Sequence, residues 1–266
     1  MNEILDATRI LFCLILLIYA SWSDYKTREV SNKVWIILGP ISLVLTSFQL
    51  LVYSPQPIHA IIFYFLSFGI TSSLVIIIFY VGGFGGADAK ALMCIALALP
   101  IYPNNLFPQQ PGFISPLFPI TIFTNSVLLG ALSVFYALFR NLFWKVKNKR
   151  DIFEGLENES IGKKILALFS GYKIILSKLK TGHMFPLEDI EVNDEGIKKR
   201  KLLVFPNDEE REEILTRLIK NIEKKKLDSG IWTTPGLPLL IFITLGTIIA
   251  LIYGDIVWNL LSSIIG

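Results

Sequence analysis

The sequence contains little cysteine and little histidine, with two of each in 266 residues. Both cysteines, Cys13 and Cys94, lie inside apolar runs, without a CxxC spacing and without clustered histidines. These absences exclude a disulfide framework and a zinc site of the usual spacing, and favour two small buried thiols. We therefore expect neither a metal nor a cofactor.

Charge is also scarce over most of the chain. Hydrophobic residues make up 53% of the sequence and the mean hydropathy is +0.57, which is too apolar for one soluble domain. Most of the 25 basic and 22 acidic residues are concentrated between positions 145 and 231. A net charge of +3 does not indicate nucleic-acid binding. The pattern predicts a polytopic protein of the lipid bilayer with one polar insert.

Six segments are apolar over the length that crosses a bilayer, about 17 to 25 residues. The sequence thus predicts an all-α membrane protein with six transmembrane helices, approximately at residues 4–23, 33–53, 58–81, 87–101, 117–144 and 235–259. We expect residues 1–144 to hold the first five helices, and residues 232–266 the sixth. Residues 145–231 are expected to form a small mixed α+β cytoplasmic domain, with helical periodicity at 161–179 and 208–226.

Basic residues in the links between these segments indicate an orientation. Lys26, Arg28 and Lys33 lie in the first link, Lys90 borders the third, and the fifth link is the polar insert. The second and fourth links contain no lysine or arginine. The positive-inside rule then places the first, third and fifth links in the cytoplasm and both termini outside. Arg9, near the external end of the first segment, is an exception to this pattern.

Two aspartates stand at the edges of these apolar segments. Asp24 follows the first segment and Asp88 precedes the fourth. A carboxylate at such a position is costly and indicates a function, although a helix cap or an interfacial anchor is the simpler explanation for either residue alone. Because the first segment runs inward and the fourth outward, both acids are expected at the cytoplasmic rim. Two neighbouring carboxyl groups share a proton, which is the arrangement of an aspartic protease.

The residues just before Asp88 are four glycines and an alanine: Gly82, Gly83, Gly85, Gly86 and Ala87. Glycine adopts backbone conformations closed to other residues and lets an extended peptide come near. Irregular backbone is tolerated at the membrane where it lines a wet cavity. We therefore expect this segment to approach a substrate. The nearby cations Lys26, Arg28 and Lys90 are orientation signals, and their charges favour the ionised form of a neighbouring acid.

Three segments carry a resemblance to a known family: Asp24-Tyr-Lys-Thr-Arg-Glu-Val-Ser-Asn32, Gly85-Gly-Ala-Asp-Ala-Lys90 and Trp232-Thr-Thr-Pro-Gly-Leu-Pro238. They resemble the GxGD family of intramembrane aspartyl proteases, in its type IV prepilin peptidase branch, and within it the archaeal preflagellin peptidases. A literal GxGD requires glycine at position 87, where this chain has Ala87. The archaeal branch commonly has Gly-Ala-Asp at this point.

The resemblance implies an aspartic-type endopeptidase with Asp24 and Asp88 as its dyad. Its partners would be preflagellin-like or prepilin-like precursors, from which it removes a short basic leader, the class III signal peptide, at the cytoplasmic side of the cell membrane. The four-cysteine motif of the bacterial bifunctional enzymes is absent from this chain, which implies a peptidase without N-methyltransferase activity.

Two other functions remain open at this point. An intramembrane protease of the presenilin or signal peptide peptidase branch would cut within the apolar part of its substrate. That branch has tyrosine before its first aspartate and a later Pro-Ala-Leu motif, which this chain lacks. A transporter would use the acids as an ion path. Such proteins usually show inverted repeats or charges near the midplane, and neither is found here.

Overall fold

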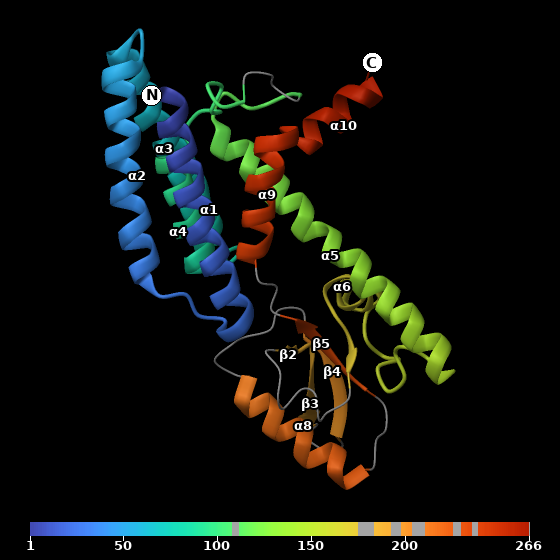
Figure 1. Ribbon diagram of the computed structural model, residues 1–266. Helices are drawn as coiled ribbons and strands as arrows, with labels where there is room; N and C mark the ends of the chain where they lie inside the picture. The colour runs from blue at the N-terminus through green and yellow to red at the C-terminus, as the bar shows by residue number, and fades with distance from the viewer. Residues whose placement is uncertain are drawn as a thin grey trace. The chain divides into compact units, whose positions relative to one another are not determined.

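The computed structural model describes residues 1–107, 112–174, 184–192, 198–203, 211–225, 230–235 and 239–265. The chain divides into two compact units, Met1–Ala131 with Pro238–Gly266, and Leu132–Leu237. The first unit is helical, and the second combines helices with short strands (Figure 1). The division falls within the long helix α5, Phe118–Asn148.

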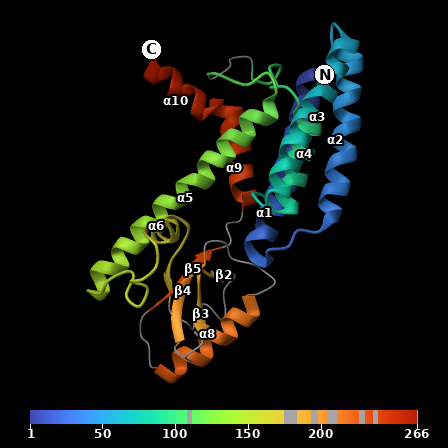
Figure 2. The same ribbon diagram turned by 180° about the vertical axis from the view of Figure 1, so that it is seen from behind.

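The first unit contains the beginning of α5 and six further helices: α1 (Asn2–Thr27), α2 (Asn32–Tyr53), α3 (Pro57–Tyr80), α4 (Gly86–Ala98), α9 (Leu239–Tyr253) and α10 (Ile256–Ile265). Helix α4 packs against α1, α2, α3 and α9, and Figure 2 shows α1 to α4 side by side. The core between these helices is apolar, with Leu17, Leu92 and Ile95 fully buried. Alanines on α4 let its neighbours come close, as small residues do between membrane helices.

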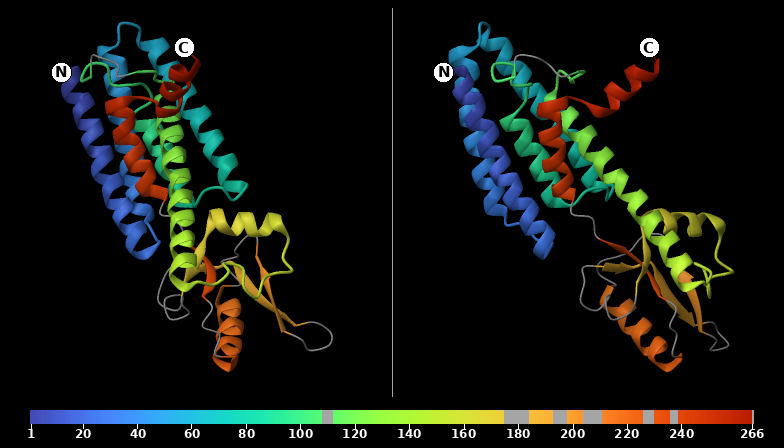
Figure 3. Two further views of the ribbon diagram at one scale, coloured as in Figure 1. Left: turned by 90° about the vertical axis from the view of Figure 1, so that its right-hand side faces the viewer. Right: turned by 45° about the vertical axis from the view of Figure 1, so that its right-hand side comes forward.

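The described residues do not confirm the six membrane spans predicted. Within the described residues, α1, α2, α3 and α5 are long and apolar enough to cross a bilayer, and α9 with α10 makes a fifth span if the bent pair counts as one. Helix α4 has 13 residues, or about 20 Å, which is less than a hydrocarbon core of about 30 Å. The predicted sixth span is broken, because α9 and α10 are bent by 53° (Figure 3).

The bend between α9 and α10 is built from specific contacts. Gly254 has a φ of 83°, a left-handed conformation that ends α9. The buried Asp255 accepts hydrogen bonds from the Trp258 N–H (3.1 Å) and the Thr124 hydroxyl (2.7 Å), so it caps the first turn of α10. Asn125 donates to the Gly254 carbonyl (2.8 Å), which fixes the bend to α5.

A close approach of α9 to α5 depends on Gly246. A Cβ atom at this position would lie 2.4 Å from Ser126 Oγ and 3.0 Å from the Ile122 carbonyl oxygen. Because the second of these atoms is backbone, Gly246→Ala has to push the helices apart, and we expect a loss of about 1–3 kcal/mol in unfolding free energy. Thermal unfolding in detergent measures the loss. Gly69→Ala on α3, where a Cβ atom meets nothing within 4 Å, is the control and should not destabilise. Equal melting temperatures for the two variants would contradict the packing argument.

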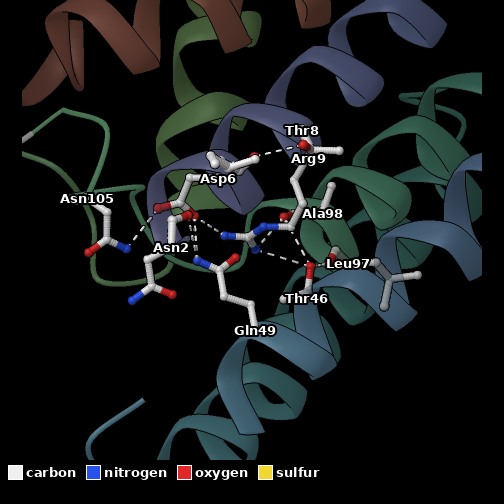
Figure 4. A network of polar contacts seen from close by, with 10 residues as sticks. Asn2, Asp6, Thr8, Arg9, Thr46, Gln49, Leu97, Ala98 and Asn105 are labelled. Atoms are coloured by element: carbon white, nitrogen blue, oxygen red, sulfur yellow. Dashed lines mark hydrogen bonds and ion pairs between the residues drawn. The ribbon is translucent and has the colours of Figure 1, made fainter. Parts of the chain in front are cut away.

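A buried polar network joins α1 to its neighbours at the end of the bundle where the chain starts (Figure 4). Asp6 and Arg9 form an ion pair on α1, and their side chains are almost fully buried. Arg9 also donates to Thr46 Oγ1 (3.2 Å), and Asp6 accepts from Gln49 Nε2 (3.0 Å), both on α2. Asn105 donates to the second Asp6 oxygen (2.9 Å). Arg9 was the exception to the distribution of basic residues that the positive-inside rule predicts. Its charge is balanced by Asp6, three residues before it.

The second unit contains the end of α5 and these elements: α6 (Ile161–Ser170), β1 (Tyr172–Ile174), β2 (Met184–Pro186), β3 (Glu188–Val192), β4 (Lys198–Leu202), α8 (Arg211–Lys225) and β5 (Ile231–Pro235). Strands β1, β5 and β2 form an antiparallel sheet in that order, and β3 pairs with β4. The predicted combination of helices and strands is confirmed. The segment from Trp232 to Pro235 differs from expectation, because it belongs to the sheet and does not open the last helix.

The second unit contains an ion pair between Glu188 and Arg200. Glu188 is fully buried and accepts two hydrogen bonds from Arg200 Nη2 (2.7 and 2.8 Å) and one from the Trp232 N–H (3.0 Å). The Trp232 ring stacks on Phe153 with ring centroids 5.1 Å apart. Because the carboxylate is saturated with donors, this charge is tolerated in the interior.

Lys173 on β1 carries a second buried charge in this unit. Its Nζ lies 4.6 Å from the centroid of the Trp144 ring and has no hydrogen-bond partner among the described residues. Burial, and after it the charge of Arg200, lower the pKa of Lys173 to about 8, although the carboxylates of Glu188, Glu154 and Asp151 act to raise it.

The low pKa of Lys173 predicts a pH-dependent stability. The unfolded chain binds the proton more tightly, so the free energy of unfolding should rise as the pH increases from about 8 toward about 10.5, the ordinary lysine value. We expect Lys173→Met to raise the melting temperature at pH 7 and to remove this rise. Lys201→Met is the control, because Lys201 is exposed and pairs with exposed Glu191. An unchanged pH dependence in Lys173→Met would refute the assignment.

Candidate active site

Asp24 lies in the last turn of α1, beside the start of α9. Helix α1 ends where Arg28 takes a left-handed conformation (φ 59°) and donates its N–H to the Asp24 carbonyl (3.0 Å). The Asp24 carboxylate accepts a hydrogen bond from the backbone N–H of Leu240. Leu240 is in the first turn of α9, where backbone N–H groups lack intrahelical partners and attract anions. The carboxylate is therefore held at a helix N-terminus.

Asp88 occupies the same kind of position on α4. It stands in the first turn, and its Oδ2 accepts a hydrogen bond from the Gly85 N–H (3.0 Å). Gly82 in the preceding segment has a φ of 83°, which a residue with a side chain adopts only with strain. A Cβ atom on Gly85 would lie 3.0 Å from Asp88 Oδ2, so glycine at this position leaves room for the carboxylate.

Asp24 and Asp88 lie on neighbouring helices, within range of each other's charge. Helices α1 and α4 pack against each other, and the charge of Asp24 acts on the Asp88 carboxyl group. Each group is only partly exposed, and each is held by a backbone N–H at the start of a different helix. Two acids in such a position can share a proton, orient a water molecule and donate to a carbonyl oxygen.

The other predicted residues of the site have distinct positions. Arg28 is near enough for its charge to act on Asp24. Lys26 is exposed and lies over the Trp22 ring, with its Nζ 5.9 Å from the centroid. Lys90 donates to Asn32 Oδ1 (2.8 Å), so it joins α4 to the start of α2. Of the three cations, Arg28 is the one whose charge acts on Asp24.

The remaining residues of the glycine segment lie just before α4 or in its first turn. Gly83 is tightly placed, since a Cβ atom there would lie 2.8 Å from Ile78 Cγ2. Gly86 is the first residue of α4, and Ala87 packs against the apolar core of the bundle. Within the described residues, no group of three or more histidine, cysteine or acidic side chains is arranged to hold a metal ion.

Two hydroxyl residues next to Asp24 were not predicted from the sequence. Ser21 donates to the Leu240 carbonyl (2.9 Å) and lies 2.7 Å from Thr244 Oγ1. These contacts fix α1 to α9 one turn away from the acid. The sequence contained a weak signal for Ser21, because it precedes Asp24 by three residues on one helix face. Thr244 is more than two hundred residues away in the chain and gave none.

Comparison with known proteins places this arrangement in a family. Residues 11–135 match the type IV leader peptidase family, and residues 163–256 match the archaeal peptidase A24 C-terminus, type II. A preflagellin peptidase of Methanococcus voltae is 30% identical over 244 residues, which are 90% of this chain and 92% of that protein. A preflagellin peptidase of Methanocaldococcus jannaschii is 23% identical over 94% of this chain and 95% of its own length. The chain therefore belongs to the type IV leader peptidase family of membrane proteases.

Proposed function

We propose that this protein is a membrane-embedded aspartyl endopeptidase that removes the short basic leader from preflagellin-like or prepilin-like precursors. The observation that supports the proposal is the position of Asp24 and Asp88 on two packed helices, near enough for the charge of Asp24 to act on Asp88. Both lie within residues 11–135, the segment that matches the leader peptidase family. The names of the relatives, preflagellin peptidases, support the class of substrate.

The proposed reaction is general acid–base catalysis with water as the nucleophile. The ionised acid of the pair takes a proton from water, and the oxygen adds to the carbonyl carbon of the scissile peptide bond. The protonated acid donates a hydrogen bond to the carbonyl oxygen, which becomes the oxyanion of a tetrahedral intermediate. When the C–N bond breaks, a proton passes to the leaving amine. The dyad returns to its shared-proton state without a cofactor.

The site is proposed to face the cytoplasm. Lys26, Arg28 and Lys33 follow Asp24 in the chain, Lys90 follows Asp88, and such basic residues mark the cytoplasmic side of membrane proteins. Both termini would then lie outside. A cut at this rim falls before the apolar segment of a precursor and releases its polar leader.

Cleavage of purified precursors tests the proposal. The full-length protein in lipid nanodiscs is incubated with a panel of preflagellin-like and prepilin-like precursors, and the product N-termini are sequenced. We expect one cut between the basic leader and the apolar segment, without methylation of the new N-terminus. A cut inside the apolar segment would favour a presenilin-like or signal-peptide-peptidase-like activity instead. Ion flux in proteoliposomes without any cleavage would instead indicate that the protein is a transporter.

A further inference from the structure

An apolar groove lies between α1 and α9. It has a volume of about 360 Å³ and is lined by Ile18, Ser21, Trp22, Tyr25, Ile241, Thr244 and Leu245. The α1 residues follow the spacing of one helix face, and Figure 1 shows α1 and α9 side by side. We name this feature the α1–α9 groove.

One end of the α1–α9 groove is at the candidate active site. Ser21, in its wall, precedes Asp24 by one helical turn. Leu240, whose N–H donates to the Asp24 carboxylate, is followed directly by Ile241 of the opposite wall. The groove then continues along α1 to Ile18, about 9 Å from Asp24 along the helix axis. It therefore leads from the acid toward the middle of the apolar helices.

The chemistry of the groove suits an apolar occupant. Ser21 Oγ is engaged by the Leu240 carbonyl and Thr244 Oγ1, and Thr244 itself donates to the Leu240 carbonyl (2.9 Å). Because these two hydroxyl groups already have hydrogen-bond partners, the surface left for contact is apolar. It includes the side chains of Ile18 and Trp22, which are 55% and 63% exposed. An apolar helix fits such a surface by shape, since packing rather than water release drives helix association in lipid.

We propose that the α1–α9 groove holds the apolar segment of the precursor, immediately after the bond that is cut. This inference rests on the proposed function. If Asp24 and Asp88 act on the bond before an apolar segment, that segment has to leave the site in the direction of the membrane. The groove passes within one helical turn of Asp24, extends along α1 to Ile18, and is lined mostly by apolar side chains. It would therefore align the bond with the acids and select precursors by the side chains of this segment.

Filling the groove tests the proposal in a kinetic experiment. Ile18→Trp places a larger ring in the groove, and Ile15→Trp is the matched control, because Ile15 is a similarly exposed isoleucine of α1 outside the groove. We expect Ile18→Trp to raise KM for the full precursor about tenfold, or about 1.4 kcal/mol, with kcat changed by less than twofold. Ile15→Trp should change neither constant. An unaltered KM in Ile18→Trp, in a wild-type enzyme that cleaves, would overturn the inference and leave the proposed function standing.

Photo-crosslinking identifies the occupant directly. A benzoylphenylalanine at position 18, in the Asp88→Asn background and in nanodiscs, should crosslink to the first residues of the precursor's apolar segment. The same probe at position 15 should not. Crosslinks to lipid alone at both positions would show that the groove holds acyl chains, which would overturn the inference. A wild-type protein that cleaves no precursor would instead refute the proposed function on which it rests.

Discussion

Asp24→Asn and Asp88→Asn will each reduce precursor cleavage by about 10³-fold or more. Asparagine keeps the size and the hydrogen-bond acceptor that meets the Leu240 N–H or the Gly85 N–H. It can neither take a proton from water nor deliver one to the leaving amine. Because the two acids act as a unit, the double variant should be no less active than either single variant. The measurement is kcat/KM on a purified precursor in nanodiscs.

Asp255→Asn is the matched control for this experiment. Asp255 is also a buried acid of the first unit, but its carboxylate caps α10 by accepting from the Trp258 N–H and the Thr124 hydroxyl. Asparagine can accept from Trp258 through its oxygen and donate its NH2 to Thr124 Oγ1, so the cap is kept. This variant should retain activity and melting temperature. The catalytic variants should retain their melting temperatures too, which separates lost chemistry from lost structure. Cleavage at the wild-type rate in Asp24→Asn or Asp88→Asn would exclude the proposed dyad.

The position of the two acids could be predicted from local sequence signals. A carboxylate at the edge of an apolar segment is conspicuous in a chain with so little charge. Basic neighbours such as Arg28 and Lys90 predict one depth for both acids. In the structure the acids lie on packed helices, near enough for the charge of Asp24 to act on Asp88. The glycine segment was also visible, and the left-handed φ of Gly82 gives it a physical reason.

Other parts of the fold could not be predicted from the sequence, because hydropathy does not show which contacts a helix makes. Helix α4 looked like a span, yet its 13 residues are enclosed by four other helices. The last apolar stretch looked continuous, but Gly254 and the cap by Asp255 bend it. The second half of α5 is apolar as well, and there Asn141 donates to the Gly171 carbonyl (2.8 Å) in the second unit. Each of these features depends on contacts between distant residues.

The polar network around Arg9 could not be predicted either, because it too depends on residues far apart in the chain. From the sequence, Arg9 was a basic residue on the side of the membrane where few are expected. Its partner Asp6 is close in the chain, but Thr46, Gln49 and Asn105 come from α2 and from the segment after α4. The ion pair therefore connects three separate parts of the first unit.

Arg9→Met will lower the free energy of unfolding by about 3–5 kcal/mol, because it leaves the Asp6 carboxylate buried without its cation. Removal of Arg9 also takes away one of two donors to the Ala98 carbonyl at the end of α4, the other being Thr46 Oγ1. The measurement is thermal or denaturant unfolding of the full-length protein in detergent. Thr8→Val is the control on the same helix, since Thr8 is exposed and bonds only to the Ile4 carbonyl of its own turn.

A double variant separates the cost of an unpaired buried charge from the cost of lost packing. Asp6→Leu with Arg9→Met removes both charges, so no carboxylate is left without its cation. We expect it to be less destabilised than the sum of the single variants, with a coupling of about 1–3 kcal/mol. Additive effects would mean that the ion pair contributes nothing beyond packing. Because the network reaches α4 through Ala98, loss of stability in Arg9→Met should also reduce cleavage, while the double variant regains part of it.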